Sequence, residues 1–153
     1  MTLRFPYQAT SPPGASAPPS RAMVVWRPLV PIRAFGPTGR SRTFGLALLD
    51  TGSVDTILPL AAARSLAAPL RNTGQIVRWR GVAYPVEFGD LELELADGTS
   101  TYRWMATVGF SPAPIAYLLL GSRGCLEFLD ATFFGQARIA ELDANQSFPG
   151  SIR

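Results

Sequence analysis

The chain has 153 residues, of which 47% are hydrophobic and 16% charged, and a net charge of +3, so it can pack one domain and is not globally disordered. It contains no histidine and no lysine, which excludes His-based triads, histidine zinc motifs, lysine phosphate loops and Schiff-base chemistry. Its single cysteine, Cys125, excludes an internal disulfide and a cysteine metal cage, so chemistry must rest on carboxylates, hydroxyls, backbone amides, arginines or a borrowed cofactor.

The two ends of the chain are predicted to lie outside the domain. Residues 1–22 are predicted to form a flexible arm, because Thr10–Ser20 is rich in Pro, Ser, Gly and Ala and has no large apolar group to bury. The domain is predicted over residues 23–145, with a C-terminal tail at 146–153. No segment resembles a signal peptide or a membrane span, so we expect a soluble cytoplasmic protein with no membrane partner.

The first half of the domain predicts two strands. Met23–Phe35 is rich in β-branched and aromatic residues, but Pro28 and Pro31 confine it to an edge or a bent strand. Thr43–Leu49 is a nearly continuous apolar run, which predicts a buried strand that ends at Asp50.

The middle of the chain predicts a helix and a hairpin. Pro59–Ala68 is Ala-rich, and proline suits a first helical turn. Gln75–Trp79 has strand composition, and Pro85–Leu95 alternates apolar and acidic residues as a half-buried strand does. The Asp97-Gly98 pair predicts a hairpin turn that leads into a return strand at Thr101–Phe110.

The last third predicts a buried strand at Ala116–Leu120, a short helix at Gly124–Leu129 and a final strand at Ala137–Leu142. The chain has no long repeats and no regular helical crossovers. We therefore expect an all-β fold, a small closed β-barrel with one or two short helices.

The candidate chemistry lies in the segment FGLALLDTGSVDTILP, residues 44–59. It places Asp50 at the end of an apolar strand, where an ionised carboxylate is costly unless backbone N–H groups of the next turn bind it. Gly52 admits conformations closed to other residues, and the Thr51 hydroxyl can lock the turn. An ordinary Asx turn at a strand end is the simpler alternative.

The run Asp50-Thr51-Gly52-Ser53 resembles the hydrophobic–Asp-Thr-Gly-Ala/Ser signature of the retropepsin-like aspartic proteases. The sequence after Tyr84 is similar to single-domain bacterial members of that family. The flanking stretches 46–49 and 55–58 fit the same pattern. Tyr117–Gly121 resembles the family's second hydrophobic-hydrophobic-Gly element, which packs beside the Asp-bearing loop. The resemblance covers roughly residues 23–142 and implies a retropepsin-type barrel. Many retroviral relatives have Arg directly after that Gly, whereas this chain has Ser122 and then Arg123.

The resemblance implies an aspartic endopeptidase with Asp50, Thr51 and Gly52 as its catalytic residues. Peptide hydrolysis needs both a base and an acid, and two close aspartates that share one proton provide both. The chain carries a single Asp-Thr-Gly run, so the partner is expected to be Asp50 of an identical chain in a two-fold dimer. The Thr51 hydroxyls would brace the two loops across the axis.

A cover over the site is expected from the segment around Trp79–Pro85, between two predicted strands, and the resemblance implies for it the role of the family's flexible hairpin flap, although it has one glycine where many retroviral flaps have more; an ordinary β-connection is the alternative. Its residues Gly81, Val82, Ala83 and Tyr84 would contact an extended peptide together with Ser53 and Asp55. Asp55 would bind substrate N–H groups or only cap a turn.

Other partners are weighed by charge. The first 80 residues hold ten arginines and two acids, but the arginines are dispersed and form no stripe that could track phosphates, so we expect no nucleic-acid partner. The expected partners are a second copy of the chain and an extended peptide or protein substrate. We expect no cofactor and no metal, and Cys125 is expected to be an inert core thiol. The alternative function is a non-catalytic module of retropepsin fold that dimerises or binds peptides.

Overall fold

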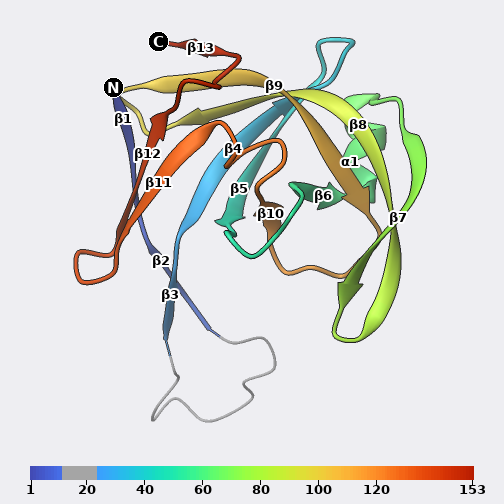
Figure 1. Cartoon of the computed structure of the whole chain (residues 1–153), viewed down its shortest axis with the longest axis horizontal. Helices are drawn as coiled ribbons and strands as arrows, with labels where there is room; N and C mark the ends of the chain where they lie inside the picture. The colour runs from blue at the N-terminus through green and yellow to red at the C-terminus, as the bar shows by residue number, and fades with distance from the viewer. Residues whose placement is uncertain (12–23) are drawn as a thin grey trace.

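The computed structural model describes residues 1–11 and 24–153, which form one short helix and many strands (Figure 1). In chain order the elements are β1 (Thr2–Pro6), β2 (Gln8–Thr10), β3 (Val25–Arg27), β4 (Leu29–Phe35), β5 (Ser41–Leu49), β6 (Ile57–Pro59), α1 (Leu60–Leu66), β7 (Arg71–Trp79), β8 (Val82–Ala96), β9 (Thr101–Ser111), β10 (Leu118–Leu120), β11 (Leu129–Phe134), β12 (Ile139–Ala144) and β13 (Ser151–Ile152). The predicted predominance of strands is confirmed.

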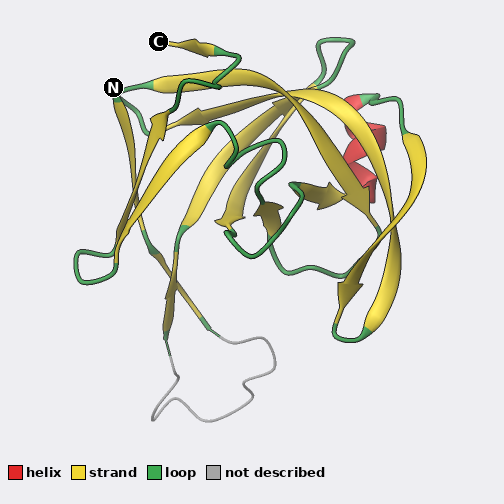
Figure 2. Ribbon diagram, in the orientation of Figure 1, coloured by secondary structure: helices red, strands yellow, loops and turns green. Residues whose placement is uncertain are grey.

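The main sheet is mixed and partly closed into a ring (Figure 2). Its strand order is β13-β9-β6-β10-β5-β4-β8-β7, and an additional pairing of β8 with β9 joins strands from the two halves of that order. β10 runs parallel to β5 and antiparallel to β6, and β6 runs parallel to β9. A second sheet has the order β1-β12-β11, and β2 and β3 form a separate two-stranded ribbon.

The predicted hairpin is the longest feature of the sheet. β8 and β9 pair without interruption from Glu87↔Phe110 to Ala96↔Thr101. Leu91, Leu93 and Leu95 are fully buried, as the alternation of this strand predicts.

The turn of this hairpin is organised by Asp97. One of its carboxylate oxygens accepts hydrogen bonds from the backbone N–H groups of Thr99 and Ser100 and from the Thr99 hydroxyl. The other accepts from the backbone N–H of Arg4 in β1 at 3.0 Å. Partial burial raises the pKa of Asp97, but these hydrogen bonds together hold it well below its usual range. The turn and the first strand are thereby tied to each other.

The N-terminal ten residues contradict the predicted flexible arm. β1 pairs antiparallel with β12, from Thr2↔Asp143 to Pro6↔Ile139. Its alternating sequence buries Leu3 and Phe5 in the main core while the side chain of Arg4 pairs with Glu141. The prediction was wrong here because two apolar residues give little signal until their partner strand is known. The Pro- and Ser-rich part of the arm, residues 12–22, lies outside the described residues.

The predicted C-terminal tail is also wrong, because residues 146–153 pack on the domain. β13 pairs with β9, and the Phe148 ring lies 5.6 Å from the ring of Tyr102 and 5.9 Å from that of Trp104. Aromatic contacts at this separation add packing free energy beyond their buried area.

Two smaller predictions have different outcomes. The segment with Pro31 was predicted to be an edge or a bent strand, and the bent strand is observed: β4 lies between β5 and β8 and has a register shift between Val30 and Ile32. The stretch 124–129 forms turns that lead into β11 and not a helix, because Gly124 has a φ of +86°.

The predicted helix at 59–68 is confirmed, with Pro59 at its N-cap and the helical residues at Leu60–Leu66. Among residues 1–11 and 24–153, no helix has the length and apolarity needed to cross a bilayer.

Strand β5, predicted to be buried, is buried on one side only, since Leu46 is 45% exposed while Ala47 is fully buried.

Replacing Leu3 with Ala tests whether β1 belongs to the folded core. Because Leu3 is fully buried, we expect Leu3→Ala to lower the free energy of unfolding by about 2–5 kcal/mol in a denaturant titration. Leu46→Ala deletes the same atoms from a half-exposed position and is the matched control, with an expected loss below about 1 kcal/mol. Equal losses for the two variants would show that β1 adds nothing to the core.

Candidate active site

Asp50 lies at the point where β5 leaves the sheet. Its backbone N–H donates to the carbonyl of Leu120 at the end of β10, at 3.1 Å. Its carboxylate oxygen Oδ1 accepts from the N–H of Gly52 at 2.9 Å, and its carbonyl accepts from the N–H of Ser53 at 3.2 Å. This is the geometry of an Asx turn. The other carboxylate oxygen accepts no hydrogen bond from the part of the chain that the structure describes.

Thr51 and Gly52 do not have the roles in the turn that the sequence predicted for the Thr51 hydroxyl and the backbone of Gly52. The φ of Gly52 lies outside the left-handed region, so glycine is not required there for conformational reasons. A Cβ on Gly52 would lie 3.3 Å from Asp50 Oδ1, a tight contact that the side chain of Asp50 would have to relieve by a small shift. Thr51 is exposed, and its hydroxyl has no hydrogen-bond partner among the described residues, so it does not lock the turn within one chain.

A second loop, residues 121–124, holds the Asp50 loop in place. The N–H groups of Ser122 and Arg123 donate to the carbonyls of Ser53 and Val54 at 3.0 and 2.8 Å. In return, the N–H of Thr56 donates to the carbonyl of Arg123 at 3.0 Å. The packing of the second Gly element beside the Asp-bearing loop, expected from the sequence, is therefore observed.

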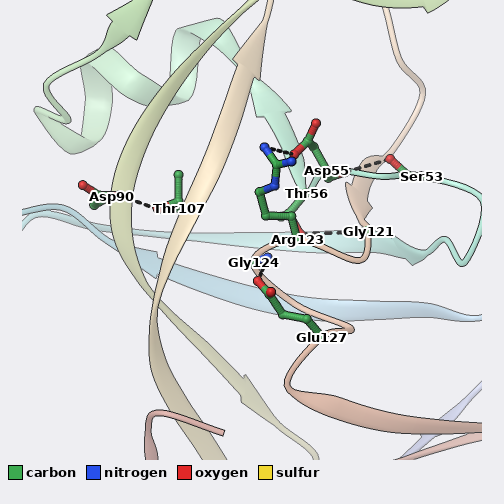
Figure 3. A network of polar contacts seen from close by, with 9 residues as sticks. All are labelled: Ser53, Asp55, Thr56, Asp90, Thr107, Gly121, Arg123, Gly124 and Glu127. Carbon is green, nitrogen blue, oxygen red and sulfur yellow. Dashed lines mark hydrogen bonds and ion pairs between the residues drawn. The ribbon is translucent and has the colours of Figure 1, made fainter. Parts of the chain in front are cut away.

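Gly121 and Thr56 form the buried centre of this contact (Figure 3). The N–H of Gly121 donates to the hydroxyl of Thr56, which is fully buried, at 3.2 Å. A Cβ on Gly121 would lie 2.4 Å from the carbonyl oxygen of Asp55 and 2.7 Å from that of Ser53. Because these are backbone atoms, only glycine lets the two loops approach so closely.

The Asp55 side chain is engaged inside the chain. Its Oδ1 lies 3.3 Å from Nη1 of Arg123, and Figure 3 shows the guanidinium turned toward it. This oxygen is buried and accepts no hydrogen bond from the described residues, so the charge of Arg123 is what compensates it. The Ser53 hydroxyl donates to the carbonyl of Asp55 at 2.7 Å. The insertion of Ser122 therefore does not prevent Arg123 from reaching the loop.

Asp50 is one of the residues that line a cavity of about 860 Å³. One wall is the end of β5, with Leu48 and Asp50. A second wall is the β7–β8 hairpin, and a third is the segment 114–119 that leads into β10. The lining is completed by Ser11, which follows β2, and by Arg27 at the end of β3. Asp50 is the single acidic residue among the described residues that line it.

The predicted cover is a hairpin with a two-residue turn. Trp79 pairs with Val82, and the turn residues Arg80 and Gly81 have φ values of +49° and +82°. Positive φ at both positions defines a type I′ turn, which explains the glycine. The alternation of β8 then places Val82 and Tyr84 in the cavity lining and leaves Ala83 out of it.

The predicted site residues thus separate into two groups. The structure brings Asp50, Val82 and Tyr84 to one cavity. The others do not line it; they are Thr51, Gly52, Ser53, Asp55, Gly81 and Ala83. The sequence analysis placed Arg80 within the predicted cover but gave it no role, and it missed Arg27 and the segment 114–117. The one signal in the sequence for the segment 114–117 was that Tyr117 begins the stretch Tyr117–Gly121, which resembles the family's second hydrophobic-hydrophobic-Gly element.

Titratable groups elsewhere have structural roles. A bidentate contact with Arg71 and a hydrogen bond from Thr107 hold the pKa of Asp90 below its usual range. Complete burial raises the pKa of Cys125 to about 12, so the thiol is inert at neutral pH, as predicted. Within the described part of the chain, no three His, Cys, Asp or Glu residues gather as a metal site would need.

No protein-family model matches this chain, and no curated protein matches it.

Gly121→Ala tests the contact between the two loops. The added Cβ would force the backbone atoms of Ser53 and Asp55 apart, so we expect a loss of about 1–3 kcal/mol in the free energy of unfolding. Gly45→Ala is the matched control, because its Cβ would meet nothing within 4 Å. A Gly121→Ala protein that unfolds at the same denaturant concentration as the Gly45→Ala protein would contradict this contact.

Proposed function

We propose that the protein is an aspartic endopeptidase of retropepsin type, with a catalytic pair formed by Asp50 of two identical chains. The observation that carries the proposal is that Asp50, with one carboxylate oxygen free of hydrogen bonds to the described residues, lines a cavity faced by the β7–β8 hairpin. A binding module has no need of a carboxylate at that place.

The need for a second chain follows from the acid count of the cavity. Peptide hydrolysis needs a base to take a proton from water and an acid to protonate the leaving group. The described lining supplies one carboxylate per chain, so a two-fold axis close to Asp50 would supply the other. The tip of the loop is suited to that contact, because Thr51 and Gly52 are exposed and Val54 is 67% exposed.

In the proposed reaction, water lies between the two carboxyl groups. The ionised carboxylate takes a proton from water while the water oxygen attacks the carbonyl carbon of the scissile peptide bond. The protonated carboxyl gives its proton to the carbonyl oxygen, which yields a gem-diol. As the gem-diol collapses, the C–N bond breaks, the carboxyl that took the proton from water gives it to the leaving amine, and the other carboxylate takes a proton from a gem-diol hydroxyl. The pair then holds one proton again.

The retropepsin type of the fold is part of the same proposal. Two features support it. The main sheet is partly closed into a ring, and the Asp50 loop is hydrogen-bonded to the loop that follows β10. The hairpin turn at Arg80-Gly81 gives the proposed flap a defined bend. An extended peptide in the cavity would lie between this hairpin and Asp50.

Asp50→Asn is expected to lower kcat/KM on a mixed peptide library by at least about a thousandfold, because both members of the pair are then neutral amides and no base remains. Its thermal unfolding and its sedimentation should match the wild type, since the amide oxygen of Asn can accept the turn hydrogen bond from the Gly52 N–H as the carboxylate does. Cleavage that persists in the purified variant would remove Asp50 from the mechanism. Cleavage absent in both proteins, with peptide binding retained, would favour the non-catalytic module.

Mixing the two proteins extends this test to the dimer. Wild-type and Asp50→Asn chains refolded together at chosen ratios should give activity that falls with the square of the wild-type fraction, because a mixed dimer holds one Asp50. Arg40→Gln chains, altered at an exposed position outside the cavity, are the control for dilution. A linear decrease with Asp50→Asn would mean that one chain carries the complete site.

The pH dependence of kcat/KM is expected to be bell-shaped, with its maximum in the acidic range or at most near neutrality. The reaction requires a pair that holds one proton, so activity is lost at low pH when both carboxyls are protonated and at high pH when neither is. Initial rates on one peptide across pH 3–9 measure this. A rate that stays constant through the acid range would contradict a shared proton.

A further inference from the structure

We propose that the cavity beside Asp50 recognises acidic peptide segments through Arg27 and Arg80, with apolar side chains of the same segment packed between them. This inference rests on the proposed function, because it assigns the cavity to an extended peptide, and it adds the class of substrate. Among the described residues that line the cavity, these two arginines are the cationic ones and Asp50 is the acidic one.

Both arginines lack an anionic partner in the chain. Neither makes an ion pair or a side-chain hydrogen bond with the described residues, and the sequence of residues 12–23 contains no Asp or Glu. On the main sheet, by contrast, Arg71 pairs with Asp90 at 2.8 Å and Arg103 pairs with Glu92 at 2.6 Å. The cavity therefore keeps positive charge that the fold itself does not neutralise.

The two charges come from separate elements at the same end of the molecule. Arg80 lies in the turn of the β7–β8 hairpin, and its guanidinium is 5.9 Å from the centroid of the Trp79 ring. Arg27 is half-buried at the end of β3. Figure 1 shows the hairpin and the β2–β3 ribbon projecting in the same direction from the main sheet. A peptide between them would meet positive charge from two walls.

The remaining walls determine what flanks the acidic residue. Leu48, Val82, Ile115 and Leu119 give the cavity an apolar lining, which favours apolar side chains in the same peptide. Asp50 repels a carboxylate placed next to it, so the acidic residues should flank the apolar centre and should not occupy the two positions joined by the scissile bond. The expected substrate is thus an extended segment with an apolar centre and acidic neighbours.

The test uses two fluorogenic peptides with the same apolar centre, one with Glu and one with Gln at the flanking positions. Each exposed ion pair changes an equilibrium constant by up to about fivefold, so we expect about a tenfold higher kcat/KM for the Glu peptide, and a smaller ratio at high salt. In the Arg27→Gln, Arg80→Gln double variant the ratio should fall to about one. Arg40→Gln, an exposed arginine outside the cavity, should keep the wild-type ratio.

Binding of the same peptides to the Asp50→Asn protein, followed by fluorescence anisotropy, separates recognition from chemistry. Arginine-dependent preference for the Glu peptide without cleavage by the wild type would support the recognition and overturn the endopeptidase. Cleavage without any preference for Glu would overturn the recognition alone. Absence of both cleavage and Glu-dependent binding would overturn both. A preference that the Arg40→Gln variant loses equally would also overturn the recognition, because it would reflect net charge.

Discussion

The contact between the Asp50 loop and residues 121–124 is the constraint on which the site depends. Each loop alone is an irregular segment with polar backbone groups, and each satisfies those of the other through hydrogen bonds between 2.8 and 3.2 Å. Buried backbone groups without partners are costly, so the two loops are stable only together. The close approach fixes where β5 ends, and therefore where the Asp50 carboxylate faces the cavity.

The same contact explains why the carboxylates of Asp50 and Asp55 have different surroundings. Asp55 is compensated by Arg123 and takes part in the loop contact, whereas Asp50 keeps one oxygen without a hydrogen bond from the described residues. Two carboxylates five positions apart in one loop therefore have different tasks. One stabilises the arrangement, and the other is exposed by it to the cavity.

The features that the sequence predicted correctly are those set by residues close together in the chain. The alternation of Pro85–Leu95, the Asp97-Gly98 turn, the short helix and Asp50 at a strand end are all of this kind. The features that were missed depend on distant partners. Leu3 is buried only because β12 lies beside it, and Arg27 reaches the cavity only because the β2–β3 ribbon lies near Asp50. The predicted helix at 124–129 is not observed; turns occupy this stretch up to the start of β11 at Leu129, and Gly124 adopts a positive φ.

The pairing of β1 with β12 has a consequence for how the chain is made. Thr2 is opposite Asp143, so β1 has no partner in its sheet until β12 has been synthesised. Contacts so far apart in sequence close large loops and slow the search for the native state. During that interval the apolar side chains of β1 are unprotected and open to wrong associations. The burial of Leu3 and Phe5 therefore waits for a strand that is made much later than their own.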